Sequence, residues 1–170
     1  VVANSVAHES ARTTSTDVAS SDESLDAITD ALLTASGLLM AISARSIASV
    51  DETITIPQFR TLVILFNDGP LNLATLAGLL DVQPSTTGRM VDRLVGPGLI
   101  HRRPHPTSRR ELVAELTARG RTVVQRVTEN RRRELSRLVE KMPAHERRGL
   151  VRALTAFTTA GDEPAYVDVD

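Results

Sequence analysis

Arginine is the residue type whose number and placement in this sequence could do chemistry. Residues 89–137 hold thirteen arginines against five acidic residues, whereas residues 1–88 hold three arginines against ten acidic residues. A guanidinium group can bind a phosphate, or two acceptor atoms of one guanine base at once. The local excess therefore indicates a polyanionic partner. A solvated, arginine-rich surface explains the charge equally well, because lysine is scarce throughout the chain, so charge alone leaves both interpretations open.

No other group of residues has the composition or spacing of a catalytic, metal or cofactor site. The chain has no cysteine, which excludes disulfides, thiolate ligands and a thiol redox sensor. Among its four histidines, His101 and His105 lie closest together, but two ligands without cysteine or a nearby aspartate make a poor metal site. There is no GxSxG motif and no glycine-rich phosphate loop. We therefore expect a protein that is not an enzyme and that holds no metal or cofactor.

Two short helices with a tight turn between them are predicted in the stretch that leads into the arginine-rich region. Asn72 can cap a helix over Leu73–Leu80, residues 81–83 form the turn, and Pro84 suits the first position of a second helix. This second helix, Ser85–Val95, ends at a Gly-Pro-Gly sequence. Together they predict a helix-turn-helix unit.

The second helix divides into an apolar and a polar face. At 3.6 residues per turn its polar face suits the major groove of DNA, where hydroxyl groups can take phosphates and arginine can bridge guanine acceptors. An ordinary amphipathic helix with a solvated face would show the same pattern. The inward side carries Thr87, Met90, Val91 and Leu94, and the outward side carries Ser85, Thr86, Arg89 and Arg93.

A β-hairpin is predicted directly after this helix. Its strands are Leu99–Arg103 and Glu111–Leu116, and the connection Pro104–Arg110 contains two prolines. The connection places Arg109 and Arg110 side by side at its far end. A hairpin that carries arginines next to a recognition helix is typical of a wing, whose arginines enter the adjacent minor groove.

Further helices flank this unit on both sides. An apolar stripe at spacings of three and four begins near Ser24, and its width requires more than one neighbour, as in a monomer core or a dimer interface. The second apolar helical region at the C-terminus leads us to favour dimerisation. The other predicted helices are Gln58–Asn67 with Thr55 as cap, Ala118–Met142 with Thr117 as cap, and Ala144–Thr159 after Pro143.

The fold class expected from these elements is mainly α with a small β-hairpin wing. We expect a disordered tail over 1–21, an N-terminal dimerisation helix over 22–50, a winged helix-turn-helix DNA-binding domain over 51–117, C-terminal dimerisation helices over 118–160 and a loose tail over 161–170. No apolar run comes near the roughly 18–20 residues of a membrane span, and the first residues lack a signal-peptide pattern. A cytoplasmic protein is therefore expected.

The order of elements and several short motifs resemble the MarR family of bacterial transcriptional regulators over roughly residues 24–160. No single motif decides the matter, but their order and spacing are together fairly specific. They are Thr55-x-x-Gln58, Leu73-x-x-Leu76-Ala77, the run Ser85–Leu94, Gly98-Leu99-Ile100, Arg109-Arg110 and Leu116-Thr117-x-x-Gly120.

The resemblance implies a homodimer that binds double-stranded DNA as a transcriptional repressor, with one winged helix on each half of a near-palindromic operator. It places Arg110, with Arg109 beside it, in the minor groove. Many family members also respond to small, often phenolic effectors, for which residues 32–45 and 55–66 would supply the cleft. One departure is Ser108, where the family has an aspartate that braces the wing arginine. The competing hypothesis is a winged-helix protein-interaction module that does not bind DNA.

Overall fold

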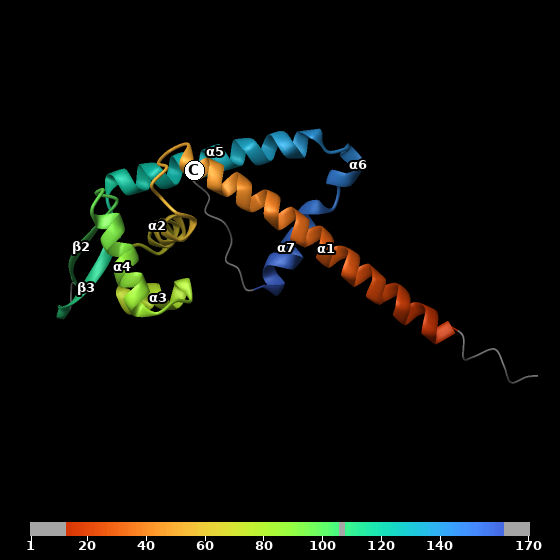
Figure 1. Cartoon of the computed structure of the whole chain (residues 1–170), viewed down its shortest axis with the longest axis horizontal. Coiled ribbons are helices and arrows are strands. Elements are labelled where there is room, and N and C mark those ends of the chain that lie inside the picture. The colour runs from red at the N-terminus through yellow and green to blue at the C-terminus, as the bar shows by residue number, and fades with distance from the viewer. Residues whose placement is uncertain (1–12, 106–107, 162–170) are drawn as a thin grey trace, which may run out of the picture. The chain divides into compact units, whose positions relative to one another are not determined.

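The computed structural model describes the backbone of residues 13–105 and 108–161 and the side chains of residues 25–104 and 112–161. The chain divides into two compact units, Val1–Ala41 and Ile42–Asp170. Helices dominate and the strands form one small sheet, as expected for the fold class (Figure 1). The elements are α1 (Thr13–Ala48), α2 (Ile56–Asp68), β1 (Leu71–Asn72), α3 (Leu73–Leu80), α4 (Pro84–Val95), β2 (Ile100–His105), β3 (Ser108–Leu116), α5 (Ala118–Lys141), α6 (Ala144–Arg147) and α7 (Leu150–Ala160).

Three predicted side-chain caps fix the starts of α2, α3 and α5. Thr55 and Gln58 form a capping box, in which each side chain accepts a hydrogen bond from the other residue's backbone N–H. The side chain of Asn72 accepts from the N–H of Thr75 at 2.8 Å, and that of Thr117 accepts from the N–H of Gly120 at 3.0 Å. These bonds satisfy backbone donors that the first turn of each helix leaves free.

The three strands form an antiparallel sheet in the order β1-β3-β2. The strands of the hairpin are longer than predicted, because His105 already pairs with Ser108 and only residues 106–107 lie between them. The prediction that Pro104–Arg110 forms the connection is therefore wrong. Pro104 is tolerated within β2 because β2 is an edge strand, where a missing N–H breaks no ladder on the open side.

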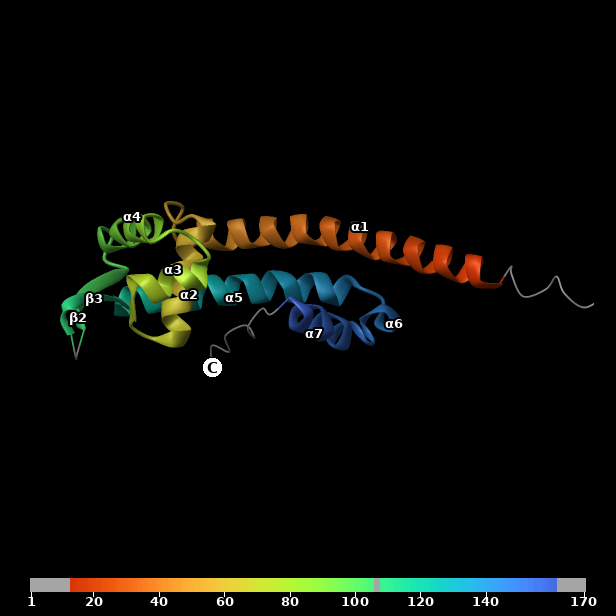
Figure 2. The same cartoon turned by 90° about the horizontal axis from the view of Figure 1, so that it is seen from below.

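The core of the winged-helix region brings together α2, α3, α4, α5 and the sheet. Figure 2 shows α2 beside the first part of α5, and α3 packs against α2 in turn. The side chains that meet there are almost fully removed from solvent, which makes their apolar burial the main contribution to stability. The residues at 1% exposure or less include Leu62, Leu65, Leu76, Val91, Leu94, Leu99, Ile100, Val124 and Val127.

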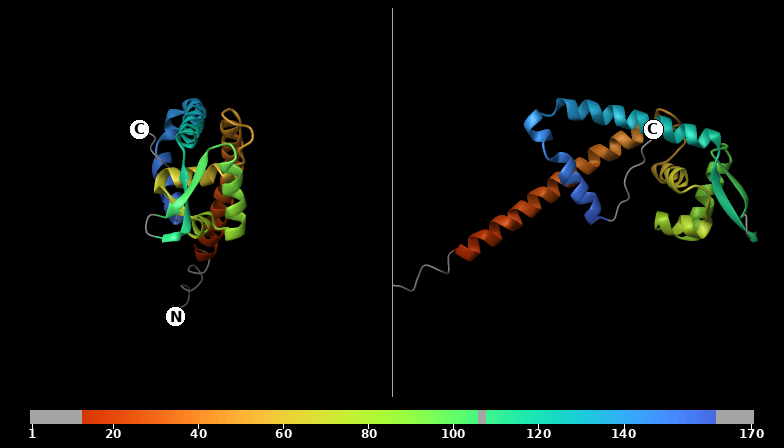
Figure 3. Two further views of the ribbon diagram at one scale, coloured as in Figure 1. Left: turned by 90° about the vertical axis from the view of Figure 1, so that its left-hand side faces the viewer. Right: turned by 180° about the vertical axis from the view of Figure 1, so that it is seen from behind.

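Both ends of the described chain differ from the sequence-based boundaries. α1 begins at Thr13 rather than near Ser24, so the expected boundary between tail and helix near residue 22 is not found. The helix predicted over Ala144–Thr159 is two helices, because Gly149 between them takes a positive φ of 86°. Such a backbone conformation cannot continue a right-handed helix. Figure 3 shows α6 at the end of α5 that is remote from the wing.

Part of α1 is longer and more apolar than we expected of any segment. This part, Leu25–Ala48, has a mean hydropathy of 1.6 and is long enough to cross a membrane. The predicted absence of such a segment was therefore wrong. Helices that bury apolar faces against other protein segments have the same length and composition, so this observation alone does not assign α1 to a membrane.

Candidate nucleic-acid interface

The two faces of α4 are divided as the sequence predicts. Thr87, Val91 and Leu94 are buried at 0–1% exposure and hold the helix on the core. Met90 is half-buried, and its sulfur accepts a hydrogen bond from the buried hydroxyl of Thr61 on α2 at 2.8 Å. The opposite side is open to solvent. There, Ser85, Arg89 and Arg93 are exposed and Thr86 is half-buried.

A hollow of about 280 Å³ lies along one flank of this exposed side. Its floor combines the start of α2 with α4, so apolar groups such as Pro57 and Met90 lie close to guanidinium groups. Of the residues expected to form an effector cleft, only members of the 55–66 stretch take part. The lining residues are Thr55, Pro57, Gln58, Thr86, Arg89, Met90 and Arg93.

An ion pair ties the wing to the other flank of α4. The Nη2 atom of Arg102 on β2 lies 2.9 Å from the Oδ1 atom of Asp92 and donates to the backbone oxygen of Gly88 at 3.3 Å. We had not assigned Arg102 a role from the sequence. The sequence does indicate which face of the hairpin Arg102 lies on. Residues two apart in a strand share a face, and Ile100, two residues earlier, is buried against the core. These two contacts fix β2 against α4.

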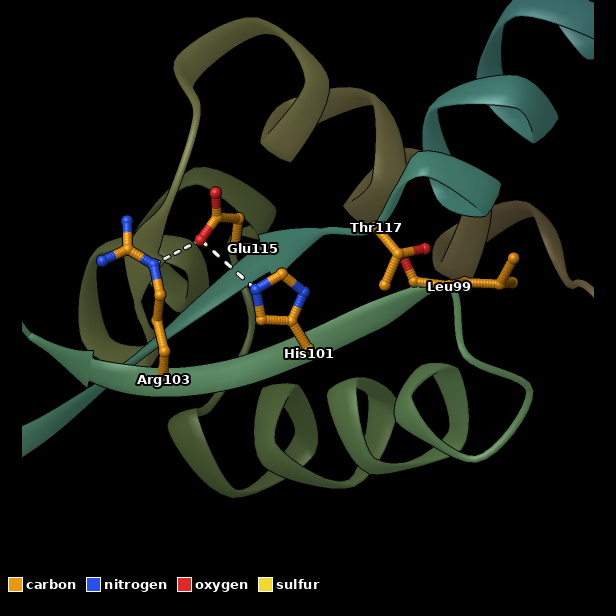
Figure 4. A network of polar contacts seen from close by, with 5 residues as sticks. All are labelled: Leu99, His101, Arg103, Glu115 and Thr117. Carbon is orange, nitrogen blue, oxygen red and sulfur yellow. Dashed lines mark hydrogen bonds and ion pairs between the residues drawn. The ribbon is translucent and has the colours of Figure 1, made fainter.

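The opposite face of the hairpin carries a second polar cluster (Figure 4). Arg103 on β2 donates a hydrogen bond to Glu115 on β3, and the Nε2 atom of His101 lies 3.4 Å from the same carboxylate. The bond from Arg103 lowers the pKa of the Glu115 carboxyl from its ordinary value, so Glu115 is ionised at neutral pH. This arrangement pairs charges across the two strands. No cluster of three potential metal ligands is found among the described residues.

The start of α5 is bonded to the segment that leads into the wing. The hydroxyl of Thr117 donates to the backbone oxygen of Gly98 at 2.7 Å, and its N–H donates to the oxygen of Leu99 at 3.1 Å. Figure 4 shows Thr117 next to Leu99. Arg119 adds a bond to the oxygen of Pro97 at 2.7 Å. The wing is thus held at its base by α5 and along one strand by α4.

Five further arginines of the arginine-rich region differ in their surroundings. Arg109 and Arg110 belong to the backbone of β3, but their side chains lie outside the part that the structure describes. Arg131 packs over the ring of Phe59, with 5.7 Å between the guanidinium carbon and the ring centroid, which makes it part of the α2–α5 contact. Arg132 and Arg133 beside it are exposed. The structure therefore brings together four of the six expected DNA-binding residues on α4 and leaves the two on the wing untested.

Comparison with known proteins bears on this geometry. The MarR family model matches residues 54–112, which run from the cap of α2 to the middle of β3. The crystal structure of RV1404 from Mycobacterium tuberculosis is 75% identical, covers 84% of this chain and 97% of that chain, and superposes with a TM-score of 0.78.

Two more distant proteins match as well, one by sequence and one by structure. The uncharacterised HTH-type transcriptional regulator YfiV of Bacillus subtilis (strain 168) is 26% identical over 106 residues, which span 62% of this chain and 66% of that protein. A mutant of S. aureus MepR bound to an oligodeoxyribonucleotide is 20% identical, covers 78% of this chain and 96% of that chain, and has a TM-score of 0.61, which shows a common fold. On the family match, the close relative and the shared winged-helix geometry, this chain belongs to the MarR family of transcriptional regulators and is not an enzyme.

Proposed function

We propose that this regulator acts as a homodimeric repressor that binds a near-palindromic operator in double-stranded DNA. The observation that carries the proposal is the exposed side of α4, which presents two hydroxyls near the N-terminus of the helix and two arginines further along. In a helix that lies in the major groove, the first pair can take phosphates and the second pair can read guanine. The proposed contacts on α4 are Ser85, Thr86, Arg89 and Arg93.

Arg109 and Arg110 complete the proposed DNA surface from the wing. The backbone of β3 places both next to the end of the hairpin. Insertion of an arginine into the minor groove is favoured where the groove is narrow and its potential most negative. The structure of a MepR mutant, a protein with this fold, bound to an oligodeoxyribonucleotide supports DNA binding by such a scaffold.

Exposed apolar side chains support the homodimer. Large apolar residues on α1 and on α7 are more than 50% exposed in the single chain. Exposed apolar side chains of this kind usually mark a surface that binds another protein. A second copy that covers these helices would explain their composition, and we assign dimerisation to 22–50 and 118–160 and DNA binding to 51–117. The most exposed are Leu25, Ile28, Leu33, Met40, Val151 and Phe157. Binding to chromosomal operators also places the protein in the cytoplasm.

We further propose that a small aromatic acid releases the protein from DNA. The hollow beside α4 offers apolar walls and the guanidinium groups of Arg89 and Arg93, which are the same groups that would bind DNA. A carboxylate lodged there would compete directly with the duplex. Benzoate, titrated into a preformed complex, should then lower DNA binding, whereas toluene, which lacks the carboxylate, should not.

The test of the main proposal is a binding titration with duplexes selected from a randomised library. The association constant should fall steeply with salt, because several phosphates are neutralised in each complex. Substitution of Arg110 by alanine should weaken binding by about 1–3 kcal/mol. A flat salt dependence would favour the competing hypothesis of a protein-interaction module, and unchanged binding of the Arg110→Ala variant would remove the wing from the interface.

A further inference from the structure

Gly88 lies in the middle of α4, the proposed recognition helix, and neither the backbone conformation nor the packing of the chain requires a glycine there. Glycine is unfavourable in a helix interior, because the unfolded backbone gains more freedom than with any other residue. Its presence usually marks a tight turn, a positive φ or a close contact. Among the described glycines only Gly69, Gly98 and Gly149 have positive φ, and Gly88 lies well inside α4.

Packing within the chain does not require the glycine either. A Cβ atom added at Gly88 would meet no atom within 4 Å. The contrast is Gly120, where the same atom would lie 2.2 Å from the backbone oxygen of Leu99. Arg102 does approach Gly88, but it binds the backbone oxygen, which every residue type has. The space beside Gly88 is open and available to a partner.

The position of Gly88 on the helix indicates which partner uses this space. Residues three and four apart share a helix face, so Gly88 lies in line with Ser85 and Asp92, both of which are exposed. An acidic group repels a phosphate, and Asp92 is held by Arg102 rather than offered to DNA. The stretch of helix at Gly88 and Asp92 is therefore better suited to lie over the edges of base pairs than along the sugar-phosphate backbone, which Ser85 nearer the N-terminus can reach.

We propose that Gly88 is a specificity-determining residue, whose missing side chain allows the backbone of α4 to lie against the edge of one base pair in the major groove. The inference rests on the proposed function, in which α4 enters that groove. Close approach of a backbone to a ligand is an established use of glycine. A side chain at this position would move the helix out of the groove or demand a different base pair.

The first experiment compares the Gly88→Ala variant with the wild type on a duplex that the wild type selected and on a scrambled duplex of equal composition. We expect binding to the selected duplex to weaken about tenfold or more, as for loss of one specific base contact, and binding to the scrambled duplex to stay within twofold. The melting temperature should rise by about 2 °C, because alanine is the better helix former. A more stable variant with unchanged affinity for the selected duplex would overturn the proposal.

Gly78→Ala is the matched control. Gly78 also lies inside a helix, α3, and an added Cβ there meets no atom within 4 Å. This variant should gain stability to a similar extent and bind the selected duplex as the wild type does. An equal loss of binding in both variants would show that the effect is not local to the recognition helix and would contradict the inference.

Two further comparisons separate the remaining explanations. If Gly88 served only the contact with Arg102, the effect of Gly88→Ala would vanish in an Arg102→Ala background, which would overturn the proposal. A new selection with Gly88→Ala should change the preference at one base pair in each half-site, and a uniform loss at all positions would also overturn it. Failure of the wild type itself to select any sequence would instead contradict the proposed function.

Discussion

Gly120 shows why the motif Leu116-Thr117-x-x-Gly120 ends in a glycine. The contact of its Cα with the chain ahead of the wing is so close that a Cβ would lie 2.2 Å from the oxygen of Leu99 and 2.8 Å from a methyl group of Leu116. The first of these atoms is backbone and is already held by the N–H of Thr117. The motif Leu116-Thr117-x-x-Gly120 therefore combines a helix cap with a site that only glycine fits.

We predict that Gly120→Ala destabilises the protein by about 1–3 kcal/mol, as expected when a group is forced into a packed interior. The loss should appear in urea-induced unfolding as a lower midpoint with an unchanged slope. Gly78→Ala serves as control, because an added Cβ at Gly78 meets no atom within 4 Å. Equal midpoints for the Gly120→Ala variant and the wild type would show that the contact relaxes freely.

The role of Arg102 comes from its contact between β2 and α4, two elements whose packing the sequence does not reveal. It had no predicted role, whereas Arg109 and Arg110 were expected to act from sequence position alone. In the structure Arg102 neutralises Asp92, an acidic group on the side of α4 that would face DNA. Long-range pairs of this kind depend on how β2 lies against α4, which residue spacing does not determine.

At the scale of elements, the tie between β2 and α4 leads to a prediction about charge. The pair is partly exposed, with side-chain exposures of 31% for Arg102 and 63% for Asp92, so Arg102→Ala should cost less than about 1 kcal/mol of stability. Operator binding should suffer more, because an unpaired Asp92 would then repel nearby phosphates. Anisotropy titrations at fixed salt measure this effect.

The double variant Asp92→Ala/Arg102→Ala decides the cause of that loss. If repulsion by Asp92 is responsible, the second substitution should restore most of the binding that Arg102→Ala removes. Arg102→Lys keeps the charge and should bind nearly as the wild type does. A double variant as weak as Arg102→Ala alone would mean that Arg102 contacts the DNA itself.

Helix starts and helix faces were predictable, because they depend on residues close in sequence. Thr55, Asn72 and Thr117 cap the helices that their types and positions predicted, and the buried side of α4 follows its apolar period. The extent of the hairpin was not predictable from Pro104. Proline normally argues against a strand interior, and its tolerance follows from the edge position of β2, which depends on the whole sheet.

Two other features of the fold could not be predicted from the local sequence. The strand β1 is only two residues long and exists through its pairing with Ala114 and Val113 of β3, so no local alternation indicates it. Gly149 interrupts the last helical region through its positive φ, whereas glycine within a helical pattern is compatible with a continuous helix. In the candidate site, the exposed residues of α4 followed from helical periodicity, but the open space at Gly88 depends on how neighbouring elements pack around the helix.

At the scale of the whole molecule, charge and apolar surface separate along the chain. The arginine-rich region covers α4, the wing and α5, while large exposed apolar side chains occur on α1 and α7. The first distribution suits a polyanion, and the second suits burial against another protein surface. Joint binding of two half-sites by one dimer would raise the operator affinity far above that of a single winged helix.

Phe157 on α7 offers the sharpest test of the dimer. Its side chain is 55% exposed in the single chain, and we expect it to be buried in the dimer. Phe157→Asp would place a charge in that interface without a partner, which is strongly unfavourable. We predict that the variant sediments as a monomer near 18.4 kDa at a concentration where the wild type is a dimer. Its operator affinity should fall as well, because the two half-sites are then bound independently.

Thr159→Asp is the matched control for this substitution. It adds the same charge to the same helix at an exposed position, and Thr159 lies two residues from Phe157, on another face. This variant should remain dimeric and bind DNA as before. If Phe157→Asp also remained a dimer with full affinity, α7 would lie outside the interface, and the exposed apolar residues of α1 would have to form it alone. Sedimentation velocity of both variants therefore distinguishes an interface built from both terminal regions from one built by α1.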